Sequence, residues 1–129
     1  MERICKNITL ENLETHKKLY GILYTQKILA GKWKLAILWF LREEKQRYNE
    51  IKRFLGDISQ GSLTKQLREL EDDEIISRKV YPEVPPRVEY FLTDKGKKLI
   101  SIFNSMEEFG IFWVDEHIKK MKNSKKHLL

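Results

Sequence analysis

A stretch near the middle of the chain, 59–73 (SQGSLTKQLRELEDD), concentrates side chains that can bind a polyanion. Cationic groups attract phosphate, and small hydroxyl and amide groups bond to phosphate oxygens or to the edges of bases. The chemistry that this pattern predicts is the binding of DNA rather than the breaking of bonds. The candidate DNA-binding residues in the stretch are Ser59, Gln60, Gly61, Ser62, Thr64, Lys65 and Arg68.

The two cations of this stretch suit different contacts. Arg68 can present its forked guanidinium either to guanine O6 and N7 or to a phosphate, and both contacts remain open. Lys65 is expected to contact a phosphate, and Gly61 permits a close approach. Base edges or the DNA backbone are the expected partners of the smaller polar side chains, Gln60, Ser62 and Thr64.

A helix is the element predicted to position these side chains. Ser59 suits its N-cap, because a short hydroxyl can accept from the free N–H groups of the first turn. Leu63, Leu67 and Leu70 recur at i, i+4 and i+7 and form one buried stripe, which leaves the polar residues on the other face. Acidic residues follow only after Arg68, so the positive N-terminal end of the helix would face phosphate. For this stretch alone, an amphipathic helix with a solvated polar face remains the alternative.

The overall composition agrees with a polyanionic partner. The 129 residues carry 25 Lys and Arg against 19 Asp and Glu, a net charge of +6. The histidines (His16, His117 and His127) are scattered, and no metal-binding spacing, nucleophile motif or glycine-rich phosphate loop occurs. We therefore predict no enzyme activity, no metal and no cofactor.

The segments around 59–73 predict a winged helix-turn-helix. A helix over 46–55, entered through a short extended piece, leads by a glycine-containing turn into 59–73. Strand-like segments at 75–81 and 87–92 flank a proline-rich loop, which cannot continue a ladder. The expected fold class is mainly α with a small β-hairpin wing. Lys79 and Arg87 are the wing residues predicted to contact DNA.

The outer helices are too apolar for a single domain of this size to cover. A helix over 32–44 is apolar almost all round and should be central, whereas 9–29 and 94–121 carry broad apolar faces. A homodimer built on the two outer helices is the economical explanation, and a long helix that wraps its own core is the rival. The predicted interface residues are Leu13, Tyr20, Leu23, Tyr24, Phe103, Met106, Phe109 and Trp113.

One domain over 1–129 is expected. It would comprise an arm and dimerisation helix (1–29), a DNA-binding core with the wing (32–92), a second dimerisation helix (93–121) and a basic tail (122–129) expected to fray. No apolar run is long enough to cross a bilayer and no secretory signal is visible, so a cytoplasmic location without membrane contact is the default. A small-molecule effector is possible, but nothing in the sequence supports one.

Several motifs together resemble the HxlR-type transcriptional regulators. They are GKWK at 31–34, RYNEI at 47–51, SQGSL at 59–63, LRELE at 67–71 and YPEVPPRVEY at 81–90, and the last is the most specific. The resemblance runs from about residue 19 to residue 96 and continues more loosely along the last helix. It implies a DNA-binding dimer of a prokaryotic cytoplasm that represses or activates nearby genes. Its two recognition helices would lie in successive major grooves, about 34 Å apart.

The chain departs from this family in its cysteine. Several family members sense oxidants through a cysteine shortly before the GKW motif, where this chain has Leu-Tyr-Gly at 19–21. Cys5 is the only thiol and lies well upstream, so the redox role is not carried over to it. A flexible arm that brings Cys5 to its dimer mate remains a weaker alternative, and the family leaves the extension 1–18 unexplained.

Two alternatives are kept open. PadR- and MarR-type regulators are the nearest competitors at the level of the fold, and the proline-rich wing argues against both. A winged helix that binds a protein instead of DNA is the competing function. Apolar or acidic residues at Lys65, Arg68 and Arg87 would favour protein binding, and this chain has cations there.

Overall fold

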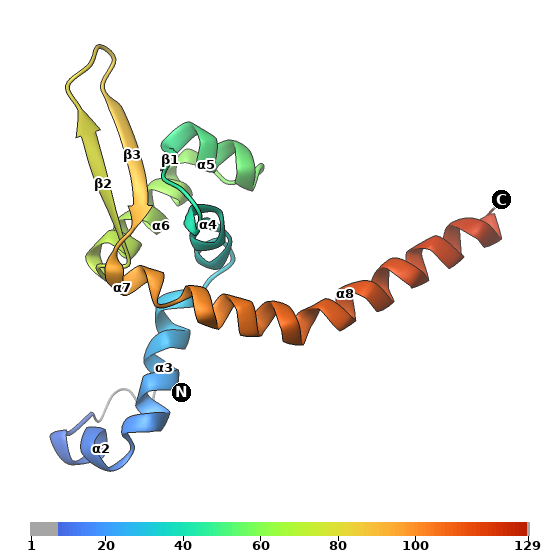
Figure 1. The fold of residues 1–129 in the computed structure, drawn as a ribbon, viewed down its shortest axis with the longest axis horizontal. Helices are drawn as coiled ribbons and strands as arrows, with labels where there is room; N and C mark the ends of the chain where they lie inside the picture. The colour runs from blue at the N-terminus through green and yellow to red at the C-terminus, as the bar shows by residue number, and fades with distance from the viewer. Residues whose placement is uncertain (1–7, 129) are drawn as a thin grey trace.

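The computed structural model describes residues 8–128 and forms a helical body with a small sheet. The helices are α2 (Leu10–Thr15), α3 (Lys17–Leu29), α4 (Lys34–Leu41), α5 (Tyr48–Leu55), α6 (Gln60–Asp72), α7 (Asp94–Lys97) and α8 (Ile100–Leu128). The strands are β1 (Gln46–Arg47), β2 (Ile76–Tyr81) and β3 (Arg87–Leu92). Mainly helical structure with a hairpin wing after α6 confirms the predicted fold class (Figure 1).

The wing is the longest feature of the three-stranded antiparallel sheet, whose order is β1-β3-β2. β2 and β3 pair from Ile76 opposite Leu92 to Tyr81 opposite Arg87, and the loop between them lies at the free end of the hairpin (Figure 1). The extended entry to α5 becomes β1 and pairs with the other edge of β3. The sheet thereby joins α5 to the wing.

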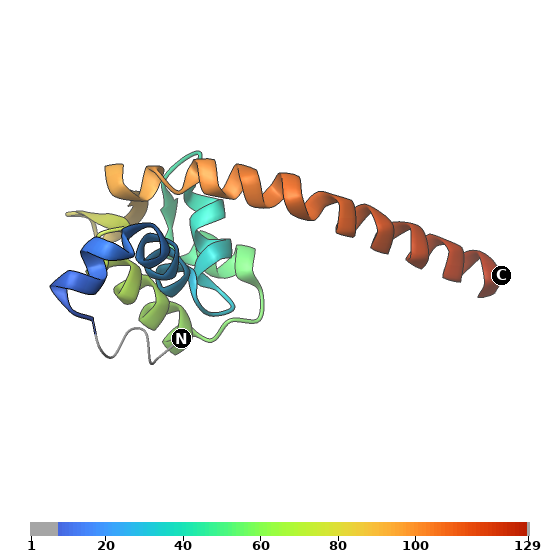
Figure 2. The ribbon, with the colours of Figure 1, turned by 90° about the horizontal axis from the view of Figure 1, so that it is seen from below.

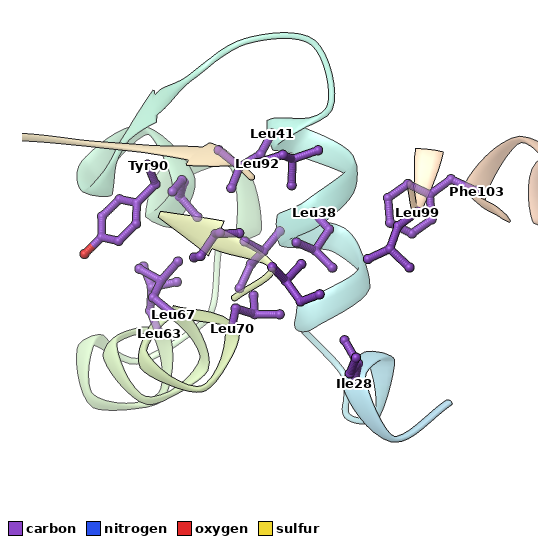
Figure 3. Close-up of a cluster of buried hydrophobic side chains, with 14 of the residues drawn as sticks. Ile28, Leu38, Leu41, Leu63, Leu67, Leu70, Tyr90, Leu92, Leu99 and Phe103 are labelled. Carbon is purple, nitrogen blue, oxygen red and sulfur yellow. The ribbon is translucent and has the colours of Figure 1, made fainter. Parts of the chain in front are cut away.

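The core lies between α4, α6 and the base of the wing. Leu63, Leu67 and Leu70 are at most 1% exposed, and they point from α6 toward Leu38 of α4 and Leu92 of β3 (Figure 3). The predicted leucine stripe is therefore confirmed. Its burial fixes which face of α6 remains in solvent, because the opposite side of a helix cannot share the same contacts.

The predicted helix over 9–29 is wrong as a single element. It breaks at His16, whose φ of −117° and ψ of 36° are not helical, and α2 and α3 lie on either side. No residue of α2 is buried. Since most helical stability in proteins comes from a packed face, nothing forces α2 to continue straight into α3. The helix predicted over 32–44 is also shorter, at Lys34–Leu41.

The last helix differs from the prediction at both of its ends. Its first turn is a separate short helix, α7, within which Gly96 lies against the backbone of Ile75. A Cβ on Gly96 would be 2.1 Å from the Ile75 carbonyl oxygen, so this approach requires glycine. α8 then runs to Leu128 instead of ending near Met121, and the predicted tail over 122–129 is helical as far as residue 128. Lysine is a good helix former, which explains the extension.

α8 leaves the body of the protein and projects into solvent (Figures 1 and 2). Its exposed aromatic side chains include Phe109 at 79%, Trp113 at 63% and Phe112 at 61%. Across residues 8–128, no helix combines the length and the apolar character that crossing a bilayer requires.

Candidate nucleic-acid interface

The N-terminus of α6 is capped as predicted. The Ser59 hydroxyl oxygen accepts from the backbone N–H of Ser62 at 3.1 Å, which satisfies one free donor of the first turn. The structure places the other predicted side chains of this helix on one outward side: Gln60, Gly61, Thr64, Lys65 and Arg68 are exposed, and Ser62 is half-buried. α6 therefore presents a polar and cationic face to solvent.

Tyr48, at the start of α5, holds this end of α6 in place. Its hydroxyl donates to the backbone carbonyl of Gln60 at 3.1 Å and lies 3.1 Å from the hydroxyl oxygen of Thr64. Sequence spacing alone misses this role, because the contact joins positions 12 and 16 residues apart. The sequence did offer one indication of this role: Tyr48 was expected to face inward, and a tyrosine hydroxyl near the core usually finds a hydrogen-bond partner.

Two of the acidic residues after Arg68, Glu69 and Glu71, are paired with cations of the protein body. Glu69 forms an ion pair with the largely buried Lys34 of α4, and the hydrogen bond from Lys34 holds the pKa of Glu69 below its ordinary value. Glu71 lies 3.4 Å from Arg78 of β2. These pairings partly neutralise the carboxylates, so they oppose an approaching polyanion less than free ones would.

The two predicted wing cations gather around one aromatic ring. The guanidinium carbon of Arg87 lies 4.0 Å from the ring centre of Tyr81, and the ammonium of Lys79 lies 5.0 Å from it. Arg87 is half-buried and also lies 3.4 Å from a carboxylate oxygen of Glu83, whereas Lys79 is exposed. Lys79 is therefore the freer of the two charges.

The hydroxyl end of this ring belongs to a small polar network. Lys45 lies 3.6 Å from a carboxylate oxygen of Glu89 and 3.5 Å from the Tyr81 hydroxyl. A hydrogen bond from Tyr81, followed by the charges of Lys45 and Arg87, lowers the pKa of Glu89. The network joins the entry to β1 with both wing strands and braces the half of the wing nearer its loop.

An open groove of about 810 Å³ separates the wing loop from the start of α5. Arg47, Arg53 and Arg87 line it together with two carboxylates, Glu50 and Glu83. A second hollow of about 380 Å³ also lies on α5. Its lining residues are Asn49, Lys52, Arg53 and Gly56.

The polar face of α5 is absent from the sequence-based candidates. Asn49, Lys52 and Arg53 follow the i, i+3, i+4 spacing of one helix face, and Arg47 directly precedes the helix. That spacing was the signal that could have found them. α5 adds a second cationic surface beside α6.

The predicted dimer residues divide into two groups. Five of them are exposed: Leu13 (40%), Tyr24 (50%), Met106 (45%), Phe109 (79%) and Trp113 (63%). Tyr20 and Leu23 are half-buried. Phe103 differs, because it is 6% exposed and packs into the core of its own chain (Figure 3). The first turn of α8 still touches the body, where Ile100 is half-buried and Phe103 is buried. We therefore remove Phe103 from the candidate interface.

Tyr24 is also tied to the C-terminal end of α6. The ammonium of Lys95 donates to the Tyr24 hydroxyl at 3.1 Å and to the carbonyl of Asp73 at 3.0 Å. The hydrogen bond with Tyr24 raises the pKa of Lys95. α3 is thereby connected to the helix that carries the candidate DNA-binding face. Cys5 lies outside the described residues.

Comparison with known proteins agrees with this architecture. Residues 28–118 match the family described as HxlR-like helix-turn-helix. A regulatory protein named MalR from Fusobacterium mortiferum is 47% identical over 104 residues, which cover 80% of this chain and 96% of that protein.

Two solved structures illustrate the likeness of the fold. The redox regulator HypR in its reduced form is 40% identical, with a TM-score of 0.71 over 77% of this chain and 98% of HypR. A regulator assigned to the MarR family from Porphyromonas gingivalis W83 is 40% identical, with a TM-score of 0.66 over 70% of this chain and 88% of that one. Both likenesses extend over most of the winged-helix body.

Proposed function

The chain belongs to the HxlR-like helix-turn-helix family of transcriptional regulators, whose members are not enzymes, and we propose that it binds a specific DNA sequence as a homodimer. The observation that carries the proposal is the outward face of α6. It is capped at its N-terminus, exposed, and cationic at Lys65 and Arg68, and Glu69 and Glu71 of its acidic end are paired with the body. A face of this kind suits the major groove, where a recognition helix reads base edges with its N-terminal residues.

In this proposal α6 supplies the base contacts. Arg68 either reads guanine through its two parallel donors or binds a phosphate, and Lys65 binds a phosphate. Gln60 and Thr64 face the base edges. Ser62 is half-buried, and the Ser59 hydroxyl oxygen already accepts from its backbone N–H, so these two residues shape the end of the helix that meets DNA.

The groove between the wing and α5 is proposed as the path of one phosphate backbone. Arg47 and Arg53 are its phosphate ligands, and Lys79 extends the contact along the wing. Arg87 supports the loop, because its charge already lies beside Glu83 and on the ring of Tyr81. Phosphate contacts of this type set the register of the protein on the duplex without reading its sequence.

Dimerisation is proposed through α3 and the projecting part of α8. Clustered exposed aromatic side chains on an otherwise uncovered helix usually mark an interface, and a two-fold dimer covers such a surface with its own copy. Tyr24, Met106, Phe109 and Trp113 are the proposed contacts, with Leu13, Tyr20 and Leu23 at the margin. The dimer would hold two α6 helices about 34 Å apart. The cytoplasm of a prokaryotic cell is the proposed location, because the relatives named above come from bacteria and a transcriptional regulator must reach the chromosome.

Selection from a random duplex library tests the function and identifies the operator in the same experiment. The full chain should enrich a two-fold symmetric site, and Arg68→Ala should weaken binding to that site. Lys119→Ala is the matched control, because it removes one exposed cation from α8, outside the proposed DNA surface. A library that stays random after repeated selection would contradict sequence-specific binding.

A further inference from the structure

We infer from the contacts of Tyr48 that the Thr64 hydroxyl acts only as a hydrogen-bond acceptor toward DNA, and that it reads an exocyclic amino group in the major groove. The groups concerned are N6 of adenine and N4 of cytosine. This inference rests on the proposed function and adds a specificity-determining pair, Tyr48 and Thr64, to it.

Counting protons assigns the donors. A tyrosine hydroxyl carries one proton, and a backbone carbonyl can only accept. The 3.1 Å contact between Tyr48 and the carbonyl of Gln60 therefore uses the Tyr48 proton. The second 3.1 Å contact, between the hydroxyls of Tyr48 and Thr64, can then be made only by the proton of Thr64.

The Thr64 hydroxyl has no proton left for a ligand. Both lone pairs of its oxygen remain available to accept, and Thr64 lies on the exposed side of α6. Thr25 shows the ordinary alternative: its hydroxyl donates to the carbonyl of Gly21, four residues earlier in its own helix, at 2.8 Å. At Thr64 a neighbouring helix takes the proton instead, so Tyr48 fixes the direction in which the Thr64 oxygen can accept.

Thr64 and Arg68 then make a complementary pair. They lie one helical turn apart and line the same hollow of about 330 Å³ beside Tyr90. Arg68 can only donate, and Thr64 can only accept. A base pair offers both partners in the major groove, because amino groups donate there while N7 and O6 accept. The acceptor-only oxygen of Thr64 would be repelled by guanine O6, guanine N7 and thymine O4, because each of these atoms is also an acceptor.

Base analogues provide the test on the enriched duplex. Each adenine of one half-site is replaced singly by purine, and each cytosine by 2-pyrimidinone, which removes one amino group at a time. At one position the wild type should lose about 3- to 10-fold in affinity, the range of one hydrogen bond. Thr64→Val keeps the shape and removes the hydroxyl, so it should bind the parent and that analogue duplex equally.

Tyr48→Phe tests the positioning role. It keeps the ring and frees the Thr64 hydroxyl to turn, either toward the carbonyl of Gln60, as Thr25 turns to Gly21, or toward DNA as a donor. In both cases the oxygen loses the direction that Tyr48 gives it, so the penalty for the missing amino group at that position should shrink toward 1-fold. 7-Deazaadenine or 7-deazaguanine, which lacks the N7 acceptor, is the matched control. Where Arg68 reads N7, that analogue should weaken the wild type and Thr64→Val alike. Circular dichroism should show that both variants remain folded at the temperature of the binding assay, so that a change in the analogue penalty reports recognition.

The outcomes separate the inference from the proposed function. If the wild type enriches no site, specific DNA binding itself fails, and the inference fails with it. If a site is enriched but no amino deletion weakens the wild type, or if Thr64→Val is equally sensitive to the deletion, the inference is overturned while DNA binding stands. If Tyr48→Phe does not fold, the comparison of wild type with Thr64→Val still decides whether Thr64 reads the amino group.

Discussion

Gly96→Ala should destabilise the protein more than any other glycine substitution among the described residues. The new Cβ would lie 2.1 Å from the Ile75 carbonyl oxygen, whereas real Cβ contacts are essentially never shorter than 3.0 Å. Because the obstacle is backbone, α7 and the start of β2 must separate by at least 0.9 Å, the difference between those two distances.

Hydrogen bonds at this junction would stretch with the shift. The N–H of Thr93 donates to the Ile75 carbonyl at 3.1 Å, the hydroxyl of Thr93 donates to the Glu74 carbonyl at 2.6 Å, and the N–H of Gly96 donates to the Thr93 hydroxyl oxygen at 3.0 Å. Overpacking and the loss of one or two such bonds give a cost of about 2–4 kcal/mol. At about 4 °C for each kcal/mol in a chain of this size, Tm should fall by about 8–16 °C.

The assay is thermal unfolding followed by circular dichroism at one fixed protein concentration. Gly21→Ala is the matched control, because a Cβ at this exposed position of α3 meets nothing within 4 Å. Alanine is the better helix former, so this variant should be more stable by about 0.5–1 kcal/mol. If Gly96→Ala retained the wild-type Tm, the close approach of α7 to Ile75 would be wrong.

Four further results are expected. Leu67→Ala, at 1% exposure, should cost about 2–5 kcal/mol in urea unfolding, and a loss below about 1 kcal/mol would contradict its place in the core. Folding lowers the pKa of Glu69, so its pairing with Lys34 stabilises the protein above the ordinary pKa of 4.5, and this stabilisation is lost as the pH falls below that value. Glu69→Gln should therefore flatten the plot of unfolding free energy against pH in this range, and an unchanged plot would argue against the pair with Lys34. Lys65→Ala should reduce the salt dependence of DNA binding by about one ion, whereas an unaltered slope would remove it from the phosphate contacts. Phe109→Asp should give a monomer in sedimentation velocity, and a persistent dimer would place the interface elsewhere.

The sequence predicts the DNA-facing unit well because local rules fix it. Ser59 caps α6 and three leucines set its buried face, so the helix appears within a residue of the predicted limits. Proline cannot continue a ladder, and the wing strands end on either side of the prolines as predicted for that reason. The family resemblance, which draws on the same stretches, is confirmed.

Three features that the sequence did not predict depend on contacts between distant parts of the chain. The docking of α7 depends on the approach of Gly96 to Ile75, which no periodicity reports. Phe103 has the spacing of an outer-face residue, yet the direction in which α8 leaves the body buries it. Tyr48 has an inward-facing position in its own helix, and only the docking of α6 gives its hydroxyl two partners. Such features require the tertiary arrangement.

Fluorescence anisotropy with the library-selected duplex and a scrambled duplex, at low and at physiological salt, tests the central claim most directly. Specific DNA binding predicts a preference of about 10³-fold or more for the selected duplex, and affinity for both should fall steeply as salt rises. Arg68→Ala should lose about 1–3 kcal/mol on the selected duplex only, if Arg68 reads a base. Equal affinity of the wild type for the two duplexes at both salt concentrations would contradict sequence-specific DNA binding by this protein.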